Sequence, residues 1–148
     1  MLGSLADELL RVVGDAMEGL RNRSEPEVSF KPAPGEWSPK EILGHLIDSA
    51  ANNHHRLVRA QGLPELLFPP YQQEDWVKIQ DYNSASWMEL VELWRLYNLH
   101  LGHVIKKIPE GKGKSICRIG DGAPMSLGLL VEDYLAHLRH HLRQLGAA

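Results

Sequence analysis

Trp37-Ser38-Pro39-Lys40-Glu41-Ile42 is the clearest helix start in this chain of 148 residues. Ser38 can cap the helix, Pro39 stands at its first position, and Glu41 can bond back to the cap, so the three form a capping box. Trp37 can pack on Ile42 as a hydrophobic staple that fixes how the chain enters the helix. The apolar spacing that follows predicts a helix that continues to about Gly62.

Three further amphipathic stretches lie outside this helix, at about 2–23, 86–108 and 126–145. Their apolar residues recur at helical spacing, and the segments between them are rich in proline or glycine. Ser86 and Glu89 predict a second capping box, and Ser126 can cap the last stretch. Four helices in this length predict one all-α domain over residues 1–148, folded as an up-down four-helix bundle. The connection from Pro64 to about Asn83 is long enough to be a functional lid. Its candidate lid residues are Tyr71, Asp75 and Trp76, and the alternative is that they only cover the bundle end.

The composition excludes several classes of protein. Charged residues make up 24% and apolar residues 43% of the chain, which is ordinary for a soluble globular protein. The net charge of −3 argues against a nucleic-acid-binding face. The single cysteine, Cys117, excludes an internal disulfide and indicates a reducing compartment. Because no apolar run approaches the length of a membrane span and no signal peptide is apparent, we expect a cytoplasmic protein.

The pentad His137-Leu138-Arg139-His140-His141 contains two histidines four residues apart within the last predicted helix. Four residues advance a helix by about 400°, so His137 and His141 lie about 40° apart on one face. Their Cβ atoms are then about 5–6 Å apart, close enough for both imidazoles to bind one ion. His45, on the helix that starts at Ser38, would complete a three-histidine site with open positions, the form that catalytic metals use. The alternative is that the pair lies on the surface and coincides by chance.

The surroundings of His45 can also be read from the pattern. It lies on a polar strip of its helix, where a histidine is more often solvated than a ligand, and Asp48 one turn later could accept its second ring proton. Asn98 falls inside an apolar stripe, so its amide needs partners. The remaining histidines project away from the apolar stripes and are expected at the surface: His54, His55, His100, His103 and His140.

The segment Trp37–Asp48 resembles the motif W-S-x-x-E-x-x-x-H-L-x-D of the DinB-like (DinB/YfiT) superfamily. The segment from His137 to Gln144 resembles the same family's final-helix signature, H-x-x-H-H-x-x-Q. Members are four-helix bundles that hold a divalent metal with three histidines. Carried over to this chain, the resemblance implies that His45, His137 and His141 are the metal ligands.

The resemblance also implies a range of activities. Characterised relatives include low-molecular-weight-thiol S-transferases and a mycothiol-dependent maleylpyruvate isomerase. We therefore expect a metal-dependent enzyme, of thiol S-transferase or hydrolase type, that acts on a small molecule. We expect zinc or nickel as the ion, since nitrogen ligands suit both and the sequence does not distinguish them. A low-molecular-weight thiol is the expected partner, Cys117 is not assigned as a nucleophile, and the apolar faces of the first and third predicted helices favour a homodimer.

Two other classes of protein remain compatible with the sequence. The chain could bind a metal without catalysis, as a sensor or as a bundle braced by its ion. It could also be a metal-free interaction bundle, in which the histidines are incidental. Metal content and metal-dependent turnover distinguish these classes.

Overall fold

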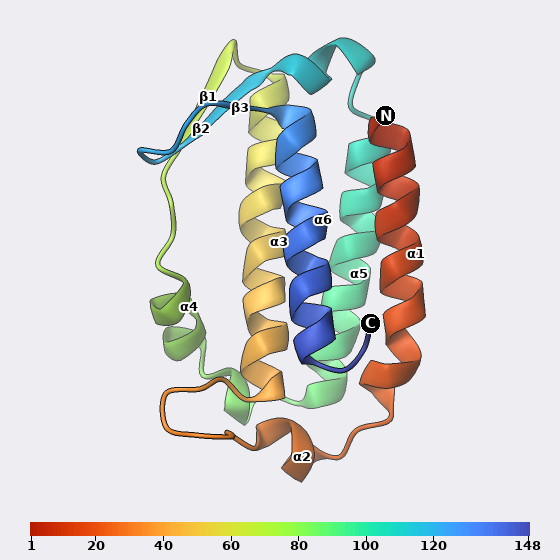
Figure 1. Ribbon diagram of the computed structural model, residues 1–148, viewed down its shortest axis with the longest axis vertical. Coiled ribbons are helices and arrows are strands. Elements are labelled where there is room, and N and C mark those ends of the chain that lie inside the picture. Colours follow the sequence, from red (N-terminus) through yellow and green to blue (C-terminus); the bar gives the residue numbers. More distant parts are fainter.

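Four long helices form a bundle in the computed structural model, which describes all residues, 1–148 (Figure 1). They are α1 (Leu2–Arg21), α3 (Pro39–Gln61), α5 (Trp87–Lys106) and α6 (Leu127–Gln144). Helices α1 and α3 each pack against both α5 and α6. The predicted four-helix bundle is confirmed. None of the helices combines the length and the apolar character that crossing a membrane requires.

The helices do not alternate strictly in direction, which corrects the up-down order expected from the sequence. Figure 1 shows α1 and α6 running one way and α3 and α5 running the other way. The long connection between α3 and α5 carries the chain back along the bundle, so both helices begin at the same end. As a result, α1 and α3 lie on a diagonal of the bundle. Helices α3 and α6 are antiparallel neighbours, which places the start of α3 opposite the end of α6.

A small sheet covers the end of the bundle where α3 ends and α6 begins (Figure 1). Strand β1 (Glu65–Phe68) pairs in parallel with β2 (Ile116–Ile119), and β2 pairs antiparallel with β3 (Met125–Ser126). The all-α sequence prediction lacked these strands, because two to four residues are too few to show a period of two. The remaining short elements are α2 (Glu25–Ser29), α4 (Gln73–Gln80), η1 (Tyr82–Ser84) and η2 (Glu110–Lys114).

The bundle has a hydrophobic core of 34 buried residues, to which every long helix contributes. Buried polar groups join the helices within it. The indole Nε1 of Trp87 donates a hydrogen bond to the carbonyl of Leu20, 2.6 Å away, and thereby links α5 to α1. Asn98 accepts a hydrogen bond from the hydroxyl of Tyr134 at 2.5 Å and donates one to the carbonyl of Trp94 at 2.9 Å. The amide therefore has the partners that its burial requires, and it connects α5 to α6.

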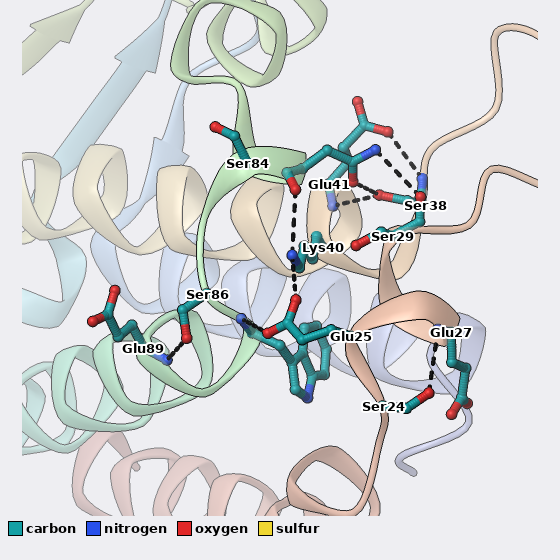
Figure 2. Close-up of polar contacts among 12 residues, drawn as sticks. Ser24, Glu25, Glu27, Ser29, Ser38, Lys40, Glu41, Ser84, Ser86 and Glu89 are labelled. Carbon is teal, nitrogen blue, oxygen red and sulfur yellow. Dashed lines mark hydrogen bonds and ion pairs between the residues drawn. The ribbon is translucent and has the colours of Figure 1, made fainter.

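The start of α3 follows the sequence prediction. The backbone N–H of Glu41 donates to Ser38 Oγ at 3.2 Å, and the backbone N–H of Ser38 donates to Glu41 Oε1 at 3.0 Å, which completes the capping box (Figure 2). Ser86 at the start of α5 accepts a bond from the N–H of Glu89 at 3.4 Å, but the reciprocal bond of a full box is not formed.

A buried lysine holds the same end of the bundle together (Figure 2). Lys40, which exposes only 3% of its surface, lies with its Nζ 2.6 Å from Glu25 Oε2 and donates to the carbonyl of Asn83. Glu25 also accepts a hydrogen bond from the backbone N–H of Trp87, 2.9 Å away. Helices α2, α3 and α5 are therefore fixed to one another beside the first turns of α3, where His45 lies.

Candidate metal centre

Three histidine side chains from two helices converge on one point. His45 on α3 and His137 on α6 have their Nε2 atoms 3.0 Å apart, and the Nε2 atoms of His137 and His141 are 3.1 Å apart. One ring nitrogen of each residue lies within 4.8 Å of the corresponding atoms of the other two. The structure therefore brings together all three residues that the sequence singled out.

His45 is buried, although its position on a polar strip suggested a solvated side chain. It exposes only 1% of its surface, and the ring of Trp37 lies 4.9 Å away, centroid to centroid. The preceding residue, Gly44, leaves room for Tyr82, because a Cβ atom at Gly44 would lie 2.1 Å from the tyrosine ring. Trp37 thus packs beside this histidine, and Tyr82 packs on α3 at the preceding residue. Sequence periodicity does not report such packing between distant segments.

The outer ring nitrogen of His141 indicates the tautomer of that ring. Nδ1 of His141 lies 2.6 Å from the side-chain oxygen of Gln144, which can only accept, so Nδ1 carries the proton. Nδ1 of His137 lies 3.5 Å from Ser49 Oγ, and Nδ1 of His45 is buried without a partner. With the protons on Nδ1, the Nε2 lone pairs all face the common point, as metal-binding imidazoles require.

Asp48 does not act as the partner of His45 that the sequence suggested. Its Oδ1 accepts hydrogen bonds from the hydroxyl of Tyr82 at 2.5 Å and from the amide of Gln80 at 2.8 Å, while its Oδ2 is buried without a partner. Burial raises the pKa of Asp48, and these two hydrogen bonds lower it in part. The carboxylate therefore ties the end of α4 and η1 to α3.

The three imidazoles are neutral at physiological pH. Burial, with a smaller effect of the neighbouring histidines, lowers the pKa of His45 to about 3 and that of His137 to about 4. Burial also lowers the pKa of His141, although Gln144 opposes this effect. Neutral rings carry free lone pairs, so protons do not compete with a cation for this site near pH 7.

Two of the three spacings between the ring nitrogens match those found around a divalent metal ion. Three nitrogens that each lie 2.0–2.1 Å from one ion are about 2.9–3.4 Å apart, depending on the coordination angle. The Nε2 separations of 3.0 and 3.1 Å fall in this range. The chemistry of the residues and their geometry thus agree with a metal site that leaves positions open for other ligands.

A cavity of about 330 Å³ lies beside His137. Helix α3 contributes Ser49, Asn53 and Arg56 to its wall, and Asp133 lines it from α6, one turn before His137. Tyr71, one of the three candidate lid residues, also lines the cavity. The ring of Trp76 lies 5.3 Å from Tyr71, whereas Asp75 lines a different cavity, near the start of α3. The sequence did not single out Arg56, because no motif or spacing marks it.

The other histidines do not join this site. His55, His100, His103 and His140 are exposed, as expected, and His54 is half-buried. His54 and His100 have their ring centroids 5.1 Å apart on the outer face formed by α3 and α5. Cys117 is fully buried in β2, where burial raises the pKa of its thiol, so the side chain is unsuited to act as a nucleophile.

The fold and the site define a class of protein: four-helix bundles in which one helix supplies one histidine and the last helix supplies two, arranged to hold a metal ion. This chain belongs to the DinB superfamily, whose family model matches residues 8–145. The match includes all three histidines and every long helix except the first residues of α1.

Comparison with known proteins finds relatives over nearly the whole chain. A protein of Oceanobacillus iheyensis, provisionally named a metal-dependent hydrolase, is 24% identical over 136 residues, which cover 92% of this chain and 77% of the relative. A protein of Halalkalibacterium halodurans with the same provisional name is 23% identical over 126 residues, covering 84% of this chain and 72% of the relative.

A solved structure shares the fold. YfiT from Bacillus subtilis, described as a probable metal-dependent hydrolase with an unusual four-helix bundle topology, superposes with a TM-score of 0.74. The superposition covers 99% of this chain and 89% of YfiT, at 17% sequence identity. At this identity the likeness concerns the fold, including the order in which the helices pack.

Proposed function

We propose that this protein is a metal-dependent hydrolase that acts on a small molecule, with the ion held by His45, His137 and His141. The observation that carries the proposal is the convergence of three neutral imidazoles whose Nε2 atoms lie 3.0 and 3.1 Å apart beside a cavity. An ion bound there is a Lewis acid, which polarises a substrate carbonyl and makes water, or a thiol, more acidic. Zinc and nickel are the ions to test first, because both accept nitrogen ligands.

The chain's own residues supply binding and proton transfer. A cavity of about 330 Å³ is within the size range of small-molecule binding sites. Asp133 lines this cavity four residues before His137, so its carboxylate lies on the same face of α6. It is the only carboxylate in the cavity wall, and we assign it to accept the proton of the attacking water.

The names of the relatives support hydrolysis over the thiol transfer that the sequence motifs also suggest. A metal ion held by the three histidines would make either water or a thiol more acidic, so the same site would serve both reactions. Only the nucleophile, water or thiol, distinguishes them. A low-molecular-weight thiol therefore belongs in the assay beside water.

The test measures metal content and turnover on the same samples. Protein purified without an affinity tag is loaded with zinc or nickel and assayed by elemental analysis and against a panel of small esters, amides and lactones, with and without a thiol. His141→Ala is compared with His103→Ala, because His103 is exposed and takes no part in the cluster. Asp133→Asn tests the assigned proton acceptor.

We expect about one metal ion per chain and turnover that a chelator abolishes, both lost in His141→Ala and kept in His103→Ala. Asp133→Asn should keep the metal and lose about 10²–10⁴-fold in turnover, the usual contribution of a general base. Metal binding without turnover on any substrate would overturn the enzymatic proposal and favour a structural or sensory ion. Failure to bind either metal would overturn the site itself.

A further inference from the structure

Arg56 is a buried cation without an anionic partner. It lies on α3, exposes only 9% of its surface, and lines the cavity beside His137. Its Nε is buried without a hydrogen-bond partner. Burial lowers the pKa of Arg56, and the groups that oppose this effect are Tyr71 and Cys117 rather than a carboxylate. A guanidinium stays charged in proteins, so the positive charge in this cavity is not neutralised by the chain.

The surroundings compensate only part of the hydration that Arg56 has lost. Its Cζ lies 5.2 Å from the ring centroid of Phe68, a distance that permits a cation–π contact. This contact stabilises one face of the guanidinium but does not satisfy its N–H donors. Buried charges in proteins are normally paired, because the loss of water is costly otherwise. An unpaired buried guanidinium at a cavity wall is therefore a candidate binding group for an anionic ligand.

The position of Arg56 relates it to the candidate metal centre. Eleven residues separate His45 from Arg56 on α3, or about 16 Å along the helix axis. Ser49 and Asn53 lie between them and line the same cavity, which extends to His137. A molecule in the cavity can therefore present one end to the histidine cluster and the other end to Arg56.

The other charges in the cavity are few. Asp133 lines it nearer to the histidines, one turn before His137, and no ion pair connects this carboxylate to Arg56. Tyr71 lies beside Arg56, and the arginine's charge lowers the pKa of its phenol against the raising effect of burial. The cavity wall thus has one positive charge, that of Arg56, and one carboxylate, that of Asp133. Its neutral polar groups include Ser49, Asn53 and Gln73.

We propose that Arg56 binds a carboxylate group of the substrate, so that the substrate is a small carboxylic acid with its reacting bond at the other end. The planar guanidinium matches a carboxylate with two parallel hydrogen bonds, and one positive charge balances one negative charge. A phosphate dianion would call for a second cation, which the cavity wall does not supply. The proposal rests on the proposed function for the location of the reacting bond, but the anion site itself does not need the metal.

Binding of simple probes tests the anion site directly. Isothermal titration with hexanoate, hexanamide and hexyl phosphate compares a carboxylate, its neutral analogue and a dianion on the same alkyl chain. The titrations are made on the protein as purified and again after metal removal, because a carboxylate could also bind the ion. Arg56→Met removes the charge and keeps much of the side-chain volume. Arg59→Met is the matched control, because Arg59 also lies over Phe68, at 5.8 Å, but does not line the cavity.

We expect hexanoate to bind at least ten times more tightly than hexanamide, with or without metal. Arg56→Met should remove this preference, leave hexanamide binding unchanged, and leave the Tm of the ligand-free protein unchanged or higher. Arg59→Met should keep the preference. Equal or absent binding of hexanoate and hexanamide, a preference that survives Arg56→Met, or tighter binding of hexyl phosphate would overturn the assignment of a carboxylate.

A kinetic arm separates this proposal from the proposed function. If the loaded protein hydrolyses esters, Arg56→Met should raise KM for esters that carry a distant carboxylate and leave neutral esters unaffected. Turnover without any such preference would overturn the carboxylate site and leave the hydrolase standing. Arg56-dependent binding of hexanoate without turnover would overturn the hydrolase and leave the carboxylate site standing.

Discussion

Two groups of three histidines each combine α3 with one neighbouring helix, yet only one of the groups forms a site. His45, His137 and His141 join α3 to α6, and His54, His100 and His103 join α3 to α5. Each group takes one residue from α3 and two residues, three or four apart, from the neighbouring helix. In the inner group all three ring nitrogens lie within 4.8 Å of one another, and no such set is formed in the outer group.

The difference lies in burial and in the direction of the ring nitrogens. In the outer group Nδ1 of His54 lies 3.0 Å from the hydroxyl of Tyr97, and His100 and His103 stand exposed with ring centroids 6.3 Å apart. Helical spacing thus brings histidines near one another in both places. For the ring nitrogens to face a common point, the two helices must also pack closely enough to fix the orientation of each ring.

The largest expected difference is in metal binding, when one histidine is removed from each group in turn. His137→Ala removes the ring whose Nε2 faces both of the other inner histidines, so we expect loss of the bound metal and at least a 100-fold weaker affinity. His100→Ala, the outer counterpart, should leave metal content unchanged. Elemental analysis and competition with a chromogenic chelator measure both. Equal loss in the two variants would contradict the distinction between the groups.

Gly44→Ala should disturb the packing of Tyr82 against α3 at the residue before His45. The new Cβ would lie 2.1 Å from the ring of Tyr82, so the ring or the helix must move, and we expect the free energy of unfolding to fall by about 1–3 kcal/mol. Gly14→Ala is the matched control, because nothing lies within 4 Å of the added methyl group, and it should stabilise the protein by up to about 1 kcal/mol. Urea unfolding measures both values. An unchanged midpoint for Gly44→Ala would show that Tyr82 does not hold α3 in this way.

The hydrogen-bond partners of the two groups offer a finer comparison. Gln144 holds Nδ1 of His141 at 2.6 Å, and Gln144→Leu should weaken metal affinity by about 10–100-fold, as is usual when such a partner is lost. Tyr97→Phe removes the corresponding partner of His54 and should leave the affinity unchanged. Titration with zinc in a chelator buffer distinguishes the two. A normal affinity in Gln144→Leu would show that Gln144 does not orient His141.

The smallest expected effect is a slope of stability against pH in the metal-free protein. Burial lowers the pKa of His137 from about 6.5 to about 4, so between these values the unfolded chain binds more protons than the folded one. Stability from this source is therefore present above pH 6.5 and is lost as the pH falls toward 4. His137→Ala should flatten the slope of Tm over this range by a few degrees, whereas the exposed outer residue in His103→Ala should not. A slope that is identical in all three proteins would contradict the burial of His137.

Local patterns account for much of the fold. The capping box of Ser38 and Glu41, the serine caps at Ser86 and Ser126, and the apolar spacing of the four long helices each depend on residues within a few positions along the chain. Each forms as predicted, apart from the reciprocal bond missing at Ser86. The same holds for the pairing of His137 with His141, because one turn of helix suffices to place them together.

Packing between distant segments accounts for the rest. Trp37, which precedes α3, packs on His45. The parallel direction of α3 and α5 depends on the path of the chain between residues 62 and 86. The three-stranded sheet joins a strand after α3 to two strands between α5 and α6. Arg56 is the plainest case, since its charge is unpaired only because no carboxylate from another helix reaches it. The sequence alone therefore determines the helices, their caps and two of the three converging histidines. The third histidine, the cavity and its positive charge result from tertiary contacts, because burial and electrostatic pairing depend on which segments meet and not on which residues are neighbours in the chain.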